Sequence, residues 1–326
     1  MAYKKKLLFL LSLVGLLSLV YIGTLVFEPE RVNTRNASFV WLPPELQDQA
    51  DGIEITGNGA EPLVLERRGG LWVVPVEGVD YPARQGRVQD LLGLLSKRGA
   101  YPVRAGSAAS HERLGLTEDT ADRILIRGGA GLPLLDLLIG HDTAAQNEIY
   151  MRKNGQDEVR SGETAVSSYI GGARTAWYNL RLFPEGETQP LDITAIQRIT
   201  VLAPPIAEDS PAEPLVLSRN AAAGGWTLEG GGDTPPDSQR IDSYLRSIVD
   251  AEGEDFIPSM GANDQVYNEG RIVLEMGNGA ARTIRVGPLI EGNRRSAVVS
   301  GSPYVYALAE WTISRIFRDG SYFVTQ

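Results

Sequence analysis

A five-residue string, EPLVL, occurs twice in this sequence, at Glu61–Leu65 and at Glu213–Leu217. Both copies continue through an arginine and a Gly-Gly pair to a tryptophan, which is Trp72 in the first and Trp226 in the second. Apolar alternation on either side of a Gly-rich turn predicts a β-hairpin in each place. This repeated order constrains the fold most strongly, because the second half should form whatever the first half forms.

Each predicted hairpin is followed by a predicted helix. Apolar residues recur at i, i+3, i+4 and i+7, which indicates one buried helix face, in two sets: Val88, Leu91, Leu92 and Leu95, and Ile241, Tyr244, Leu245 and Ile248. Asp237 and Ser238 offer an N-cap to the second helix, whereas the first has no evident cap.

The correspondence continues beyond the helices. Two further strand pairs across Gly-rich turns are predicted, from Arg123–Arg127 to Ile139-Gly140 and from Arg271–Glu275 to Val286-Gly287. Lead-in strands (GIEI from Gly52, RITV from Arg198) and a final strand followed by an apolar-faced helix (from Glu158 and from Tyr304) complete both copies. The order predicts a tandem duplication of two α+β domains with mainly antiparallel sheets. Their spacing of about 150 residues is far longer than the period of solenoid repeats.

The predicted organisation has four parts. These are an anchor at residues 1–27, a stalk at 28–40, a first α+β repeat at 41–183 and a second at 184–326. Near the boundary, within Ala173–Glu187, four residues are too apolar for a free linker: Trp177, Leu180, Leu182 and Phe183. They predict that the two domains touch; the alternative is that they complete the core of the first repeat.

The anchor prediction rests on Leu7–Phe27, a run of 21 residues without a charge. That length suffices to cross a bilayer core, and three lysines at positions 4 to 6 place the amino terminus in the cytoplasm by the positive-inside rule. A cleaved signal peptide is the alternative, but its apolar core is shorter and ends at an A-x-A-like site. The sequence therefore predicts a single-pass protein of the cytoplasmic (inner) membrane, with the rest of the chain extracytoplasmic, or periplasmic.

Composition excludes several function classes. The chain has no cysteine, which removes disulfides and thiol chemistry. Its formal net charge of −10 argues against a nucleic-acid partner, because phosphate binding needs a basic surface.

The sequence has no recognisable catalytic, cofactor or metal site. Its two histidines, His111 and His141, are predicted to be solvated loop residues, and no G-x-S-x-G elbow accompanies them. Glu252, Glu254 and Asp255 could form a metal or acid–base cluster, but a solvated helix end is the preferred interpretation. DQVYNEG at Asp264–Gly270 lacks the ligand spacing of a calcium loop, and the Gly-rich stretches fit hairpin turns rather than a phosphate-binding loop.

Other residues allow a functional and a structural interpretation. The pairs Arg67–Arg68 and Arg294–Arg295 could hold an anionic partner, but a charged, solvated sheet edge is preferred. Trp72 and Trp226 could line a carbohydrate groove, but their equivalence in the two copies favours core positions. Trp41 could touch the membrane interface or cap the first sheet.

The order of EPLVL…LWVV, YPARQGRVQDLLGLL, LGLTEDTADRILIRG, LLIG and WYNLRLFP resembles the domain of unknown function 4340 family. These are membrane-anchored proteins typically encoded beside gliding-motility-associated ABC transporter genes, and the resemblance covers roughly residues 40–326. It implies an extracytoplasmic auxiliary component of an ABC-type transport or gliding-motility-like system, with a membrane protein as partner. We therefore expect a non-enzymatic, membrane-tethered accessory or scaffold protein. The alternative is an extracytoplasmic protein that binds a glycan, peptide or lipid in a cleft between the repeats.

Overall fold

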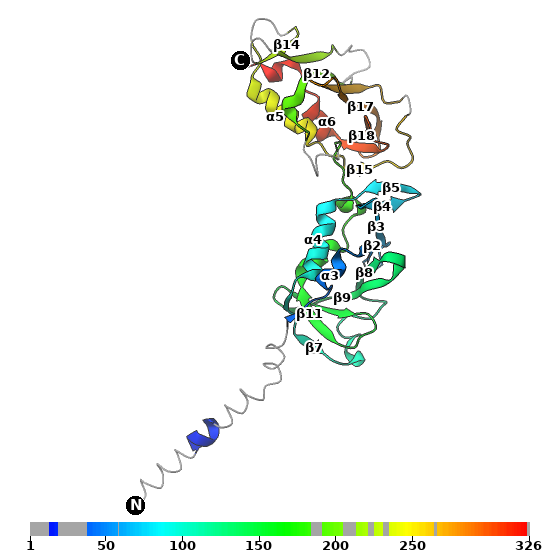
Figure 1. The fold of residues 1–326 in the computed structure, drawn as a ribbon, viewed down its shortest axis with the longest axis vertical. Helices are drawn as coiled ribbons and strands as arrows, with labels where there is room; N and C mark the ends of the chain where they lie inside the picture. The colour runs from blue at the N-terminus through cyan, green and yellow to red at the C-terminus, as the bar shows by residue number, and fades with distance from the viewer. Residues whose placement is uncertain are drawn as a thin grey trace, which may run out of the picture. The chain divides into compact units, whose positions relative to one another are not determined.

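The computed structural model describes residues 13–18, 38–57, 59–183, 191–204, 213–220, 225–230, 235–263 and 266–324 (Figure 1). It is mostly antiparallel sheet with a few helices, as predicted, and this is consistent with an α+β or a mainly β class. Among the described residues, no helix has the length and apolar character needed to cross a membrane. The predicted anchor Leu7–Phe27 lies outside the described residues, apart from a helical stretch at 13–18.

The first sheet has nine strands in the order β5-β4-β3-β2-β8-β9-β10-β11-β7. Its strands are β2 (Ala50–Thr56), β3 (Leu63–Arg68), β4 (Leu71–Val76), β5 (Val79–Pro82), β7 (Val103–Ala105), β8 (Asp122–Gly128), β9 (Pro133–Ala145), β10 (Glu148–Lys153) and β11 (Val159–Glu163). A separate two-stranded sheet pairs β1 (Ser38–Phe39) with β6 (Gly99–Ala100). The accompanying helices are α3 (Pro44–Gln47), α4 (Gln85–Ser96) and the 3-10 helices η1 (Ala108–Ser110), η2 (Gly129–Gly131), η3 (Thr164–Tyr169) and η4 (Arg174–Trp177).

The second sheet has eight strands in the order β14-β13-β12-β16-β17-β18-β19-β15. Its strands are β12 (Ile196–Leu202), β13 (Leu215–Asn220), β14 (Gly225–Leu228), β15 (Asp255–Phe256), β16 (Gly270–Met276), β17 (Ala281–Ile290), β18 (Arg294–Val299) and β19 (Val305–Ala309). The helices are α5 (Ser238–Val249), α6 (Glu310–Ile316), η6 (Ile193–Ala195) and η7 (Gly320–Phe323), and α5 and α6 lie together (Figure 1).

Corresponding strands take the same places in the two orders, and their registers match. In the first sheet Ile53 of β2 is opposite Ile126 and Leu65, and in the second Ile199 of β12 is opposite Leu274 and Leu217. The pairing also shifts at the same step of both lead-in strands, between residues 50 and 52 and between residues 196 and 198. A one-residue slip would move every apolar side chain to the other face, so buried alternation explains this agreement.

The two predicted amphipathic helices are confirmed. The buried residues of α4 are Val88, Leu91, Leu92 and Leu95, and those of α5 are Ile241, Tyr244, Leu245, Ile248 and Val249. Asp237 caps α5, because its side chain accepts hydrogen bonds from the backbone N–H of Gln239 and Arg240. At the start of α4, the side chain of Gln85 bonds the backbone of Trp72 and Ala83.

The last helix differs between the copies. We predicted an apolar-faced helix after both final strands. After β19 it is the α-helix α6, which buries Thr312, Ile313 and Ile316, but after β11 it is the 3-10 helix η3, which buries only Val166. Ser167, Ser168 and the Gly-Gly pair that follows are poor continuations of an α-helix, and they explain this outcome.

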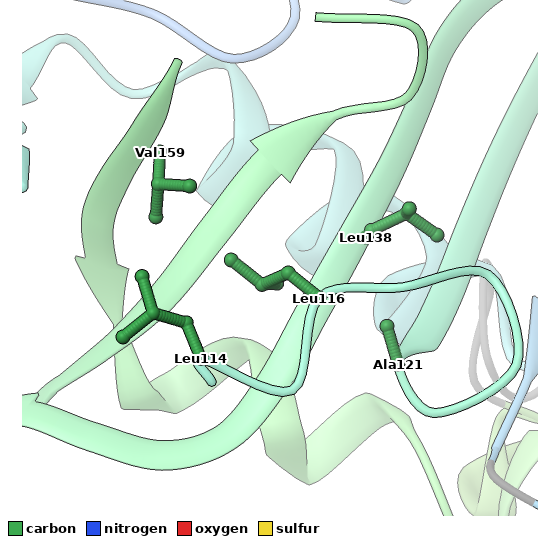
Figure 2. Packing of buried hydrophobic residues seen from close by; sticks show 5 residues of the cluster. All are labelled: Leu114, Leu116, Ala121, Leu138 and Val159. Carbon is green, nitrogen blue, oxygen red and sulfur yellow. The ribbon is translucent and has the colours of Figure 1, made fainter. Parts of the chain in front are cut away.

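Each sheet carries a second apolar cluster. In the first, Leu114, Leu116 and Ala121 from the segment between β7 and β8 pack with Leu138 of β9 and Val159 of β11 (Figure 2). In the second, Tyr267 from the segment between β15 and β16 packs with Val298 and Val305, and Ile257, Met260 and Ala262 lie against them. Each of these segments thus adds a small layer of its own to its sheet.

Contacts within the chain divide it into two compact units. One comprises residues 1–70 and 86–172, and the other residues 71–85 and 173–326. The sequence-based boundary at 183/184 is therefore not where the compact units separate. Residues 71–85 and 173–183 come from the first repeat in sequence, yet they belong to the second unit.

Candidate functional site

The two histidines do not form a catalytic pair with a hydroxyl nucleophile in the part of the chain that the structure describes. The Nε2 atom of His111, just after η1, lies 3.0 Å from the backbone oxygen of Asp157. His141 is exposed, with its Nε2 atom 3.8 Å from Oδ1 of Asp122. The prediction that His141 lies in a loop was wrong, because β9 continues past Gly140 as far as Ala145.

The carboxylates singled out in the sequence are placed differently from one another. Glu252 forms ion pairs with Arg84 and Arg181, so it is not simply a solvated residue at a helix end. Glu254 is exposed, and Asp255 begins β15. Among the described residues, no group of three or more His, Asp or Glu side chains is arranged to hold a metal ion.

The arginine pairs are not on sheet edges. Arg67 and Arg68 end β3, and Arg294 and Arg295 begin β18; both strands are flanked on either side by other strands, so the edge interpretation was wrong. All four make local bonds: Arg67 to Asp48 O, Arg68 to Glu66, Arg294 to Glu291 O, and Arg295 to Glu269.

The tryptophans are core residues. Trp72 in β4 and Trp226 in β14 are 6% and 5% exposed, as predicted. Trp41 is also buried and packs against Phe39 and Tyr101, which agrees with a cap on the first unit.

The most distinctive constellation is an aromatic cluster in the second unit that includes Tyr81, Tyr178, Phe256 and Tyr304. Tyr81 stacks on Phe256 with ring centroids 4.6 Å apart, and Tyr178 meets Phe256 edge-on at 5.1 Å. The Tyr304 hydroxyl donates a hydrogen bond of 2.7 Å to the backbone oxygen of Asp80. Burial raises the pKa of Tyr81, Tyr178 and Tyr304, so these phenols stay neutral at ordinary pH.

A backbone ladder surrounds the aromatic cluster. Asn179 N–H donates to Pro82 O (2.7 Å) and Arg84 N–H to Trp177 O (2.8 Å). The same segment bonds the residues that follow α5, through Leu182 N–H to Ala251 O (2.9 Å) and Gly253 N–H to Leu180 O (2.8 Å). Residues 177–183 thus lie between the hairpin β4–β5 and residues 251–253, hydrogen-bonded to both.

Ion pairs complete this junction. The Arg84 Nη2 atom lies 2.9 Å from Glu252 Oε2. In Arg181, Nε lies 3.6 Å from Glu252 Oε1, and Nη1 lies 3.3 Å from Asp250 Oδ1. All four side chains are partly exposed, so these ion pairs orient the segments they join but add little to the free energy of folding. We call the aromatic cluster, the backbone ladder and these ion pairs the junction.

Described residues of the second unit line two pockets. One, of about 300 Å³, adjoins the junction at Tyr304 and is lined by Leu182, Phe183, Arg282 and residues 299–304. The other, of about 570 Å³, lies at the ends of β12, β13 and β14 and has both acidic and apolar walls. Neither contains a histidine, and nothing in their linings pairs a nucleophile with a base.

The junction joins chain segments rather than reacting groups. The Tyr304 hydroxyl is bonded to the backbone, and the charged side chains pair with one another. Sequence reasoning identified Trp177, Leu180, Leu182 and Phe183 as too apolar for a free linker, and all four are buried. It missed Tyr81, Tyr178 and Tyr304. The only hint in the sequence was that aromatic residues stand in or beside the segments that meet at the junction.

A family model with the description "Domain of unknown function (DUF4340)" matches residues 72–270 of the chain. The match begins in β4 and ends at the start of β16, so it includes the whole junction except Tyr304. No curated protein and no solved structure matches the chain.

Proposed function

We propose, from the premise that this chain belongs to the DUF4340 family of domains of unknown function, that it is a non-enzymatic scaffold protein tethered to a membrane. In this proposal Leu7–Phe27 anchors the chain in the cytoplasmic membrane, and the two repeats are extracytoplasmic. They act as an auxiliary component of an ABC-type transport or gliding-motility-like system. The partner is a membrane protein of that system.

The junction is the observation that carries the proposal. A hairpin and a boundary segment of the first repeat are built into one compact unit with the second repeat. The ring contacts among Tyr81, Tyr178 and Phe256 and the backbone hydrogen bonds beside them would be unnecessary if the repeats were joined by a loose linker. A continuous connection suits a protein that holds a position on a partner, which is what a scaffold does.

We also propose that the chain arose by tandem duplication. The equal strand orders support this, since eight strands of each sheet fall in the same sequence of places. The matching bulge in β2 and β12 supports it further, because a bulge is a specific local feature rather than a general property of sheets.

A ligand-binding role is the second candidate, and the 570 Å³ pocket is the observation that favours it. Its size falls within the range of roughly 300–1,000 Å³ for small-molecule sites. The scaffold proposal is preferred because that pocket contains few converging polar groups that lack partners of their own: Glu229 pairs with Arg198, and Asp319 caps η7.

The test is site-directed crosslinking in native membranes. The chain lacks cysteine, so a single Leu132→Cys or Leu289→Cys substitution introduces one thiol for the crosslinker. Both leucines are exposed, and one lies in each unit. We expect both to capture transport-system membrane subunits, and the chain to remain in membranes after a carbonate wash. A soluble, shortened form would contradict the tether. A double variant, His111→Ala with His141→Ala, should keep the cellular phenotype; its loss in a folded variant would contradict the non-enzymatic proposal.

A further inference from the structure

The lysines of this chain are distributed unevenly. They occur only at positions 4, 5 and 6 and at Lys97 and Lys153. Both of the later lysines lie around the small sheet of β1 and β6, in a protein whose formal net charge is −10. A local positive region in an acidic chain is a feature that random surface composition does not explain.

The cations of this region gather on Phe39 of β1. The Arg160 guanidinium lies 4.2 Å from the centre of the Phe39 ring, and the Lys153 ammonium lies 5.5 Å from it. Opposite Phe39 in the sheet is Gly99, which Lys97 and Arg98 directly precede. We call Lys97, Arg98, Lys153 and Arg160 the β1 patch.

Two members of the β1 patch are already paired, and two are not. Lys97 bonds Glu163 at 2.8 Å, and Arg160 bonds Glu158 at 2.6 Å. The side chains of Arg98 and Lys153 make no ion pair or hydrogen bond with a residue that the structure describes. Burial, and then the positive charge of Arg160, lower the pKa of Lys153, so an anion placed here would relieve an unfavourable charge arrangement.

The position of the patch along the chain limits what can reach it. β1 begins at Ser38, ten residues after Glu28, which follows the charge-free run. Ten residues span at most about 35 Å when fully extended. If the run is anchored as proposed above, this face of the first unit is held close to the membrane surface.

We propose that the β1 patch binds the anionic headgroups of phospholipids in the membrane that anchors the chain. Arg98 and Lys153 contact the phosphates, and Phe39 lies at the interface with two cations near its ring. Each basic side chain near an anionic surface strengthens association by about fivefold. The tether supplies the high effective concentration that makes two such contacts sufficient. This inference rests on the membrane tether of the proposed function.

The test uses the full chain with one Ala100→Cys substitution on exposed β6, labelled with a fluorophore and reconstituted into vesicles. A lipid with a quencher on its headgroup reports proximity. We expect stronger quenching in vesicles of mixed phosphatidylcholine and phosphatidylglycerol than in phosphatidylcholine alone, and weaker quenching as salt rises. Arg98→Gln with Lys153→Gln should weaken this anionic-lipid effect by about 25-fold, two steps of about fivefold.

Matched controls make the result decisive. Arg271→Gln with Arg285→Gln removes the same charge from the second sheet and should leave the quenching of the Ala100 label unchanged. Equal quenching in both vesicle types, or equal loss from both double variants, would overturn the proposal. So would loss of quenching on addition of inorganic phosphate but not of chloride at matched ionic strength, because the patch would then be a site for free phosphate. Failure of the chain to insert at all would instead contradict the tether.

Discussion

The two sheets match in strand order and register, yet their surfaces differ in charge. In the first, Arg123 of β8 binds Asp136 of β9 through two hydrogen bonds of 2.7 and 2.6 Å. In the second, Arg271 of β16 faces Arg285 of β17 directly, and Thr283 takes the register position of Asp136. Like charges directly opposite are destabilising, but a cross-strand pair changes stability by no more than about 1 kcal/mol. Register is therefore set by the buried positions, which leaves the exposed positions free to differ.

The covering segments show the same contrast. Leu138, which corresponds in register to Arg285, is fully buried under Leu114 and Leu116 (Figure 2). Both Leu137 and Leu138 have 0% exposure, because both faces of β9 are covered there. In the second sheet the covering segment instead packs on β18 and β19, and Arg285 stays exposed.

The largest expected effect comes from the two tryptophans on corresponding strands, Trp72 on β4 and Trp226 on β14. Trp72→Ala and Trp226→Ala should each lower the free energy of unfolding by roughly 3–5 kcal/mol, the usual cost of a large-to-small core substitution. Urea denaturation of each variant measures this.

Hydrogen exchange then locates the damage of each tryptophan variant. Since residues 71–85 belong to the second unit, we expect both variants to lose amide protection in the second unit first. If Trp72→Ala instead loosened only α4 and β8, the unit assignment would be wrong. If one tryptophan cost far less than the other, the two would not be counterparts.

The second effect concerns the helix faces. Tyr244 of α5 is buried and donates a 2.6 Å hydrogen bond to the backbone oxygen of Ile316, at the end of α6. Its counterpart by spacing in α4 is Leu91. In the first sheet, the place of α6 is taken by the 3-10 helix η3 and not by an α-helix. Burial raises the pKa of the Tyr244 hydroxyl, which therefore remains a donor.

Tyr244→Phe should cost about 1–3 kcal/mol, because it leaves a buried carbonyl without its donor. Urea unfolding with intrinsic fluorescence measures the change, and Tyr322→Phe, a partly exposed neighbouring ring, is the control. An equal effect of both variants would show that the bond to α6 does not distinguish the second helix.

A third effect tests the compensated charge of the first sheet. Burial alone would raise the pKa of Asp136, but hydrogen bonds from Arg123 and Asn154 outweigh it, and the net pKa lies below the ordinary 3.8. A depressed pKa means that this contribution to stability is present above pH 3.8 and is lost as pH falls through the folded-state value.

Asp136→Asn should therefore cost about 1 kcal/mol near neutral pH, discounted for the partial exposure of Arg123. It should cost progressively less in acid. Unfolding free energies measured in urea at several pH values check this, and a pH-independent cost would contradict the ion-pair explanation.

These comparisons also show what the sequence could predict. Both amphipathic helices, their buried residues and the Asp237 cap follow from local spacing, which a single sequence displays. The junction does not, because Arg84 and Glu252 are 168 positions apart and no local pattern links them. The extent of β9 past Gly140 was also missed, since strand length depends on the neighbouring strand β10. For the same reason, alternation along one strand does not predict whether its second face is covered, or which segment covers it.

The smallest expected effect comes from a substitution that makes the second sheet more like the first. Thr283 is opposite Val273, as Asp136 is opposite Leu125, so Thr283→Asp places a carboxylate where the first sheet has one. It would lie diagonally from Arg271, as Asp136 lies from Arg123. We expect stabilisation of about 0.5 kcal/mol, because an exposed cross-strand pair is worth only that much. The gain should vanish at high salt and in an Arg271→Gln background, measured by a double-mutant cycle in urea. A stabilisation that persists without Arg271 would come from another arginine, such as Arg282 or Arg285, and would show that the two surfaces differ in geometry as well as in charge.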